Sequence, residues 1–189
     1  MAIIVGPTLP EPYFERVERV WDHLVERFGI DRYVNPYPHV TLYGLSGTAD
    51  VAAVEDAVER VAARHSPFTV RADGLGVFPG AHVYVPVAKS PALLDLHRDA
   101  AEAIAPLGEA PTDYYEPDGW FPHVGLALSL DADLAGEVVG DLLAREFDRT
   151  GGEATAGGWI GWEFTVDNLS ITRPPADGGE HELVAHIDL

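Results

Sequence analysis

Residues 38–44 read PHVTLYG, and residues 122–128 read PHVGLAL. In both stretches a histidine follows a proline and precedes the apolar residues of a predicted β-strand. Alternate side chains of a strand point to opposite faces, so His39 and Thr41 are predicted to share one face while their apolar neighbours turn to the core. His123 has the same place in the second stretch. The repeat therefore predicts two related strands, each presenting one imidazole away from the core.

Apolar periodicity on either side of these stretches alternates between helix and strand spacing, without a break in composition. We expect one α+β domain over residues 1–189, made of two similar lobes in which a histidine strand precedes an acidic helix. The strands at 68–72 and 83–87 are predicted to pair as a hairpin around FPGA at 78–81. The expected helices are 13–28, 50–65, 91–107 and 134–147, and the expected strands are 2–6, 39–45, 68–72, 83–87, 120–129, 164–172 and 181–189.

Three residues mark predicted helix ends. Asp50 and Ser90 are placed as N-caps, and the proline after Ser90 suits a first helical turn. Gly29 is placed to end the first helix. These local signals predict the helix boundaries independently of any tertiary contact.

The charge of the chain is strongly negative. It has 31 acidic residues against 12 basic ones, a formal net charge of −19, and Lys89 is its only lysine. The acids are dispersed over helix faces, which predicts a surface suited to concentrated salt, where ions screen self-repulsion. A nucleic-acid backbone needs a basic stripe instead, so any RNA substrate is expected to be held locally, at an end.

Several classes of protein are excluded by what the sequence lacks. It has no cysteine, which excludes disulfides and thiolate metal sites. It has no apolar run of about 18 residues and no signal-peptide pattern at its start, so we expect a cytoplasmic protein without a membrane segment. Carboxylates and histidines do not fall at metal-ligand spacing, so we expect no metal and no other cofactor. We also expect a monomer.

Two imidazoles that meet in one cleft suit phosphoryl chemistry without a metal. One takes a proton from the attacking water or hydroxyl, and the other gives a proton to the leaving oxygen. Histidine fits both roles because its pKa lies near neutral pH. The hydroxyl of Thr41 is placed to hold a non-bridging phosphate oxygen. A lone histidine in either context is more commonly structural, and it is the matched pair that indicates catalysis.

The two motifs resemble those of the two-histidine phosphoesterases, which include the 2′-5′ RNA ligases and the RNA 2′,3′-cyclic phosphodiesterases. That family carries two copies of histidine, apolar residue, threonine or serine, apolar residue; residues 39–42 match fully and residues 123–126 match except for the hydroxyl. The resemblance covers nearly the whole chain. It implies a bilobal α+β fold with two mainly antiparallel sheets facing a central cleft and helices outside.

The resemblance also implies an activity and a site. It implies a metal-independent phosphoesterase acting on 2′,3′-cyclic phosphate or 2′-5′ phosphodiester bonds, with an RNA 3′ end or a small cyclic nucleotide as partner. His39 and His123 would form the acid–base pair, and Thr41 would bind phosphate. Which histidine is the base is left open at this stage.

The second motif departs from the family pattern at Gly125. Glycine has no hydroxyl, although it permits a phosphate to approach a backbone N–H or a water closely. A hydrogen bond to a charged group contributes about 1.5–3 kcal/mol, so we expect a slower enzyme, which Gly125→Thr would accelerate.

Other candidate substrate-binding residues lie near the motifs. Arg32 and Arg173 are the nearest candidates for phosphate contact, and Tyr37 and Trp120 are placed to stack on bases. The remaining histidines are expected to be structural, with those on helices (His23, His65 and His97) exposed to solvent.

Two rival functions follow from the same residues. One is a protein of this fold that has lost catalysis and keeps a cleft for a nucleotide or an RNA end; Gly125 and the acidic surface favour it, and the presence of both histidines favours the enzyme. The other is a metal-dependent hydrolase, which the absence of ligand spacing disfavours.

The net charge of −19 predicts that salt stabilises the protein. Added ions shorten the Debye length from about 10 Å at 0.1 M to about 3 Å at 1 M and so weaken repulsion between dispersed carboxylates. The thermal unfolding midpoint should therefore rise between dilute buffer and molar KCl. An unchanged midpoint would contradict the proposed adaptation to salt.

Overall fold

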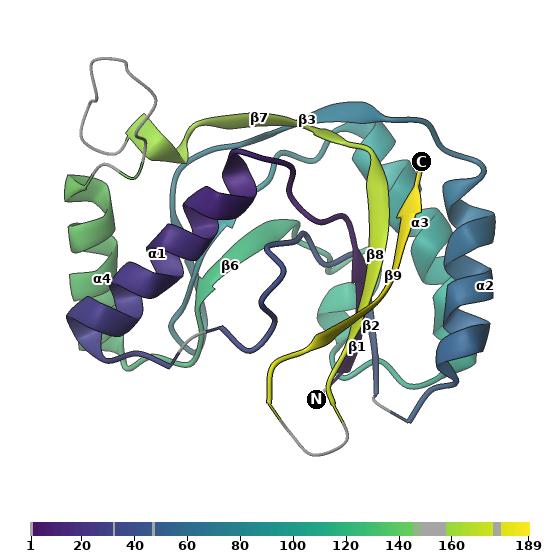
Figure 1. The fold of residues 1–189 in the computed structure, drawn as a ribbon, viewed down its shortest axis with the longest axis horizontal. Helices are drawn as coiled ribbons and strands as arrows, with labels where there is room; N and C mark the ends of the chain where they lie inside the picture. The colour runs from purple at the N-terminus through teal and green to yellow at the C-terminus, as the bar shows by residue number, and fades with distance from the viewer. Residues whose placement is uncertain (1, 32, 47, 146, 148–157, 176–178) are drawn as a thin grey trace.

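A computed structural model describes residues 2–31, 33–46, 48–145, 147, 158–175 and 179–189 (Figure 1). Over these residues the chain forms four α-helices and nine β-strands. The helices are α1 (Tyr13–Phe28), α2 (Val51–Ala62), α3 (Pro91–Ile104) and α4 (Ala132–Ala144). The strands are β1 (Ala2–Gly6), β2 (Tyr43–Ser46), β3 (Phe68–Ala72), β4 (Gly76–Phe78), β5 (His82–Pro86), β6 (His123–Ala127), β7 (Trp162–Val166), β8 (Asn168–Arg173) and β9 (Glu182–Asp188).

One sheet joins the two ends of the chain. Its strand order is β2-β1-β8-β9, and each neighbouring pair is antiparallel. Helices α2 and α3 pack against each other and against this sheet, on its outer side (Figure 1). The first histidine stretch leads into β2 and so belongs to this sheet.

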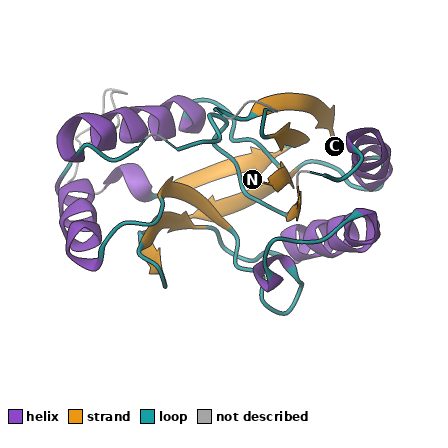
Figure 2. Cartoon of the chain, turned by 90° about the horizontal axis from the view of Figure 1, so that it is seen from below, coloured by secondary structure: helices purple, strands orange, loops and turns teal. Residues whose placement is uncertain are grey.

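The remaining strands come mainly from the middle of the chain. Strands β4-β5-β6 form an antiparallel sheet, and β3 pairs antiparallel with β7. A bridge between Ala72 and Val87 joins the end of β3 to the residue that follows β5. Helix α1 packs on β6 and α4 on β5. Figure 2 shows helices at both ends of the molecule with the strands between them, which confirms the predicted α+β class.

The repeated unit is present, but the two lobes are not successive halves of the sequence. Strand β2 is followed by α2, and β6 by α4, each helix packing on its own side of the molecule. The predicted strand 164–172 was wrong: it is two strands, β7 and β8, which separate at Asp167 and belong to different sheets. Burial alternates along β7, whereas every residue of β8 before Arg173 is buried, so both faces of β8 are covered.

The predicted hairpin was also partly wrong. Strand β3 pairs with β7 rather than with β5, apart from the single bridge at Ala72. The turn at 78–81 instead joins β5 to β4, a strand of three residues that the sequence did not predict. Such a short strand has too few residues to show alternation of its own.

Local capping places the helix ends close to the predicted positions. The Asp50 side chain accepts a hydrogen bond from the N–H of Ala52 at 3.1 Å, and Ser90 Oγ accepts one from Leu93 at 3.2 Å. Gly29 ends α1 with φ of 65°, in the left-handed region that favours glycine. Helix α4 begins earlier than predicted because the side chain of Asp131 caps it.

The segment with the first histidine runs beside β1 before β2 begins. His39 forms an isolated bridge with Thr8, outside the regular strand that was predicted from residue 39. The N–H groups of Val40 and Leu42 donate to carbonyls of the β1 segment at 3.0 and 2.8 Å. Gly6 makes this approach possible, because a Cβ there would overlap the carbonyl of Val40. The backbone of the motif is thus held against β1 and the residues that follow it, on the side where β2 pairs.

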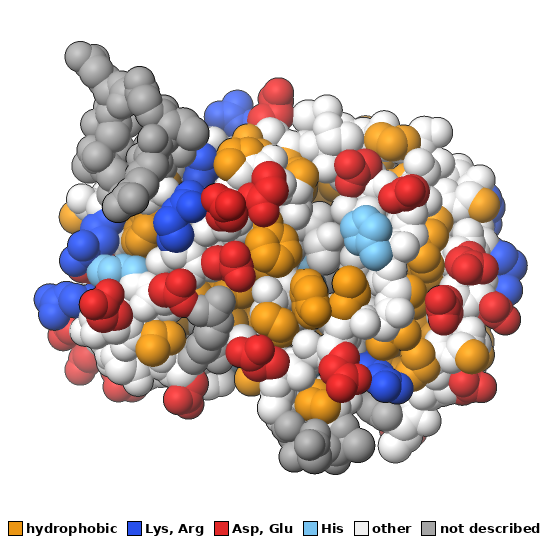
Figure 3. Space-filling model, in the orientation of Figure 1, with side chains coloured by type: hydrophobic (Ala, Val, Ile, Leu, Met, Phe, Trp, Pro, Cys, Tyr) orange, Lys and Arg blue, Asp and Glu red, His pale blue; other side chains and the backbone are white. Residues whose placement is uncertain are grey.

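Acidic side chains are spread over the face drawn in Figure 3 rather than gathered in one patch. Several arginines pair with a neighbouring carboxylate, which reduces the positive potential that they offer to a phosphate; these are Arg19, Arg64, Arg71, Arg98, Arg145 and Arg173. No helix of the described residues is long and apolar enough to cross a bilayer.

Gly6→Ala should destabilise the protein by about 1–3 kcal/mol, because the new methyl group overlaps backbone that cannot rotate away. Gly136→Ala is the matched control: this glycine is exposed within α4, nothing lies within 4 Å of the new Cβ, and alanine should stabilise the helix by about 0.5–1 kcal/mol. Urea unfolding measures both changes. A Gly6→Ala variant as stable as wild type would contradict the close approach.

Candidate active site

The first motif holds His39 and Thr41 in contact on one face. Val40 and Leu42 are buried, at 1% and 0% exposure, while His39 and Thr41 are only partly buried, as the alternation predicts. The Nδ1–H of His39 donates to the carbonyl of Tyr37 at 2.7 Å. Its Nε2 lies 3.1 Å from the Thr41 hydroxyl, which donates to it when the imidazole is neutral. The first motif therefore presents Nε2 together with a hydroxyl.

The second motif orients His123 in the same way. Val124 and Leu126 are buried, and His123 emerges on the other face of β6. Its Nδ1–H donates to the carbonyl of Phe121 at 2.7 Å, again two residues before the histidine. A carbonyl only accepts, so this bond places the proton of the neutral ring on Nδ1 and leaves Nε2 as the group available for proton transfer.

The two imidazoles lie close enough to interact electrostatically. The pKa of His39 is lowered to about 4, mainly by burial, with smaller contributions from the nearby His123 and His181. Burial also lowers the pKa of His123, with a smaller effect from His82. Both rings are therefore neutral at neutral pH before a substrate binds. A bound phosphate anion between them would favour protonation of one ring.

Aromatic rings surround His123 and account for its burial. The rings of Phe78 and Tyr84 lie 4.9 and 5.4 Å from the imidazole, both edge-on, and they stack on each other at 4.0 Å. Phe121 contacts both of these rings. Exclusion of water by such a wall strengthens electrostatic interactions at the histidine. Neither Phe78 nor Tyr84 was predicted to be near the site, since they reach it only through the β4-β5-β6 pairing.

The prediction that Trp120 stacks on a substrate base was wrong. Its side chain is only 2% exposed, and its ring stacks on His97 at 3.9 Å. The indole N–H donates to the carbonyl of Thr41 at 2.9 Å, so Trp120 positions the first motif instead. Tyr37 is partly buried, and its carbonyl holds His39; a stacking role for its ring remains a prediction.

Of the two predicted arginines, the structure describes Arg173, and none of its side-chain hydrogen bonds reaches the motifs. Arg173 lies at the end of β8, half exposed, with its guanidinium bound to Glu182 at 3.2 and 3.3 Å. A phosphate-binding role for it remains a prediction. Arg32 lies outside the described residues.

The space beside Gly125 is already filled. A Cβ at this position would lie 2.5 Å from the hydroxyl of Tyr33 and 2.7 and 2.8 Å from atoms of its ring. A threonine side chain at 125 has no room unless Tyr33 moves, so the structure gives no support to the expectation that Gly125→Thr alone accelerates the enzyme. Glycine is required here by the neighbouring tyrosine.

His181, at the start of the predicted strand 181–189, also belongs to the surroundings of His39. It is 7% exposed, and its Nδ1 has no hydrogen-bond partner among the described residues. Its proximity contributes to the lowered pKa of His39. Nothing in its local sequence distinguishes it, because the contact arises from the pairing of β8 with β9.

The helical histidines were wrongly expected to be solvated. His97 is 1% exposed, and its Nε2 lies 2.9 Å from the carbonyl of Tyr115. His23 and His65 are paired at 2.7 and 3.0 Å with carboxylates of other elements. They are structural, as expected, but as buried or paired groups.

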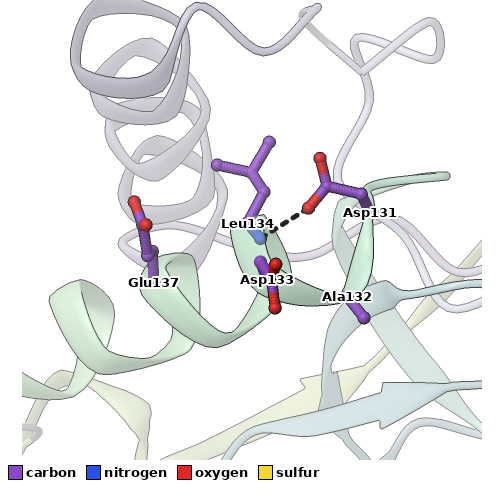
Figure 4. A pocket seen from close by; sticks show the side chains of 5 residues that line it. All are labelled: Asp131, Ala132, Asp133, Leu134 and Glu137. Carbon is purple, nitrogen blue, oxygen red and sulfur yellow. Dashed lines mark hydrogen bonds between the residues drawn. The ribbon is translucent and has the colours of Figure 1, made fainter.

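Two surface hollows are found among the described residues, and neither His39 nor His123 lines either of them. One, at the start of α4, is lined by residues 131–134 and Glu137 (Figure 4). Its three carboxylates disfavour a phosphate, and Asp131 is occupied in capping the helix. The other, of about 450 Å³, lies between residues 28–31, 33 and 34 on one side and the loop after β6 on the other, and Tyr33 forms part of its wall. Within the described residues, no group of three or more His, Asp and Glu side chains is placed to hold a metal ion.

Comparison with known proteins places this fold among the two-histidine phosphoesterases. The sequence profile of the 2′-5′ RNA ligase superfamily matches residues 9–178, and the chain therefore belongs to that superfamily. No curated protein matches it by sequence. The resemblance drawn from the two motifs is confirmed.

Solved structures support the same fold. TT0787 of Thermus thermophilus is similar over 100% of this chain and 98% of its own, with 18% identity and a TM-score of 0.68. LigT of E. coli in complex with 3′-AMP is similar over 100% of this chain and 97% of its own, with 17% identity and a TM-score of 0.62. A structure described as a phosphoesterase has the same coverage and TM-score at 16% identity.

The low pKa of His39 predicts a loss of stability in acid. Between about pH 6.5 and 4 the unfolded chain binds a proton at this histidine that the folded protein does not, so stability falls as the pH falls through this window. In His39→Gln this contribution disappears, and acidification over the same range should cost on the order of 2 kcal/mol less than in wild type.

Urea unfolding at a series of pH values measures the difference. His186→Gln, at a half-exposed histidine on β9, is the control and should follow the wild-type curve. Parallel curves for wild type and His39→Gln would show that His39 is not protonated more readily in the unfolded chain.

Proposed function

We propose that the protein is a phosphoesterase that hydrolyses, or reversibly forms, a 2′,3′-cyclic phosphate or a 2′-5′ phosphodiester bond without a metal ion. The observation that carries this proposal is the matched orientation of two imidazoles. In each motif Nδ1 is bonded to the carbonyl two residues earlier, which leaves Nε2 for proton transfer. Membership of the 2′-5′ RNA ligase superfamily supports the same class of reaction.

In the hydrolytic direction we assign the base to His39. Its pKa of about 4 keeps the ring neutral at neutral pH, and its Nε2 takes a proton from the attacking water as the new oxygen–phosphorus bond forms. The Thr41 hydroxyl, now bonded to Nε2, turns to a non-bridging phosphate oxygen when substrate binds. This places one donor beside the base.

We assign the acid to His123. The negative charge of a bound phosphate favours the protonated form of a nearby imidazole and so opposes the effect of burial on its pKa. Its Nε2–H then donates the proton to the ribose oxygen as the bond from that oxygen to phosphorus breaks. Reversal of these steps forms the bond, with the two histidines exchanging roles.

The substrate is proposed to be a small cyclic nucleotide or the 3′ end of an RNA. The acidic surface and the arginines paired with carboxylates disfavour contact with a long phosphate backbone. LigT of E. coli, which has a similar fold, has been solved with 3′-AMP, NADP⁺ and ATP. These complexes support a nucleotide-sized ligand for the present protein.

A second candidate function is a nucleotide- or RNA-end-binding protein of the same fold without catalysis. Gly125 favours it, because the second motif lacks its own hydroxyl. The retained pair of histidines favours the enzyme. The two candidates make the same prediction for binding and opposite predictions for turnover.

Wild type should convert 2′,3′-cyclic nucleotides or 2′-5′-linked dinucleotides in buffer with molar KCl and EDTA. His39→Ala and His123→Ala should each lower kcat by about 10²–10⁴-fold, because each removes one proton-transfer group. Product formation is followed by chromatography. His186→Ala, on the exposed part of β9, is the control and should retain the wild-type rate.

The alternatives give different results in the same assay. Binding of 3′-AMP without turnover of any of these substrates would favour the binding protein. Turnover that EDTA abolishes would favour a metal-dependent hydrolase. Turnover that survives either histidine substitution would contradict the two-histidine mechanism.

A further inference from the structure

Tyr33 occupies the place that a hydroxyl-bearing side chain would take in the second motif. The hydroxyl of Tyr33 lies 2.5 Å from the position of a Cβ at residue 125, which is closer than the ring atoms at 2.7 and 2.8 Å. The tyrosine therefore points its hydroxyl end, and not only the side of its ring, at this position. It fills the space into which a threonine at 125 would project.

The first motif shows where such a hydroxyl belongs. There the residue two after the histidine, Thr41, holds its hydroxyl 3.1 Å from Nε2 of His39. Gly125 stands in the same relation to His123, on the same face of β6, since Val124 and Leu126 are both buried on the other. A hydroxyl beside residue 125 is thus on the face that carries His123.

Other contacts hold Tyr33 at this position. Its ring stacks on Trp21 of α1, with ring centres 5.3 Å apart and planes 9° from parallel. The indole N–H of Trp21 in turn donates to the carbonyl of Gly125 at 3.3 Å. Tyr33, Trp21 and Gly125 therefore form one packed unit that joins α1, the segment after it and β6. The tyrosine is placed by packing and does not depend on a hydrogen bond of its own.

The hydroxyl of Tyr33 remains available for a ligand. It makes no hydrogen bond within the described part of the chain, although the residue is partly buried. Burial, with a smaller effect from nearby Tyr115, raises the pKa of Tyr33 to about 12. The phenol is thus protonated at neutral pH and can donate to an anionic oxygen.

We propose that Tyr33 supplies the phosphate-binding hydroxyl that the second motif lacks, donating to a non-bridging phosphate oxygen opposite Thr41. This inference rests on the proposed function for the identity of the ligand as a phosphate ester. Each histidine then has one hydroxyl beside it, from the same strand in the first motif and from a distant segment in the second. Gly125 is the residue that gives Tyr33 the room to reach this position.

Tyr33→Phe removes the hydroxyl and keeps the ring that stacks on Trp21. It should lower kcat/KM for a 2′,3′-cyclic nucleotide by about 10- to 100-fold, the effect of losing one hydrogen bond to a charged group, and weaken the binding of inorganic phosphate in parallel. Tyr114→Phe is the matched control, since Tyr114 is 71% exposed, and it should change neither quantity. Phosphate binding is measured by calorimetry.

A compensating pair of substitutions tests the position itself. Gly125→Thr alone should impair the protein, because the new side chain overlaps Tyr33. Tyr33→Ala should be slow, and Tyr33→Ala combined with Gly125→Thr should recover at least about tenfold of the lost kcat/KM, since space and hydroxyl are both restored on β6. Thermal unfolding checks that each variant is folded.

The outcomes separate this inference from the proposed function. Wild-type turnover and phosphate affinity that Tyr33→Phe leaves unchanged would overturn the role of Tyr33 while leaving the two-histidine mechanism intact. If wild type turns over none of the substrates, the proposed function fails, and the effect of Tyr33→Phe on phosphate binding still decides the inference. If the double variant does not fold, Tyr33→Phe alone decides it.

Discussion

Burial of two apolar side chains in each motif determines the side on which both histidines emerge. Val40 and Leu42 in one motif, and Val124 and Leu126 in the other, are almost completely buried. The alternate residues, which include His39 and His123, therefore face the other side of each strand. A register slip of one residue would bury an imidazole and expose a core side chain, which makes this arrangement strongly specified. A hydrogen bond from Nδ1 to the carbonyl two residues earlier then orients each ring.

The path of the chain explains how the two motifs come to share one region. The first sheet contains strands from both ends of the sequence, and the chain crosses between sheets at Asp167, where β7 gives way to β8. Neither half of the sequence could therefore form the first sheet alone. Because strands from both ends of the chain share this sheet, His181, just before β9, lies near enough to His39 to lower its pKa.

Packing rather than charge sets the chemical state of the site. Burial is the largest cause of the lowered pKa at both histidines, and also of the raised pKa at Tyr33. Low polarity strengthens any hydrogen bond to a phosphate. Within the described residues, the hydrogen bonds of the two histidines involve no arginine. The structure thus depends on neutral donors, such as the hydroxyl of Thr41, at a site within a strongly acidic surface.

The sequence by itself was sufficient for features that depend on neighbours along the chain. The caps at Asp50 and Ser90, the end of α1 at Gly29 and the outward faces of both motifs follow from local hydrogen bonding and from the two-residue period of a strand. The paired motifs also identified the family. Only the tertiary structure decided which distant residues complete the site. Burial of Trp120 on His97, the pairing of β3 with β7 and the insertion of Tyr33 beside Gly125 are contacts between segments far apart in sequence, whose energies depend on packing that no local pattern records.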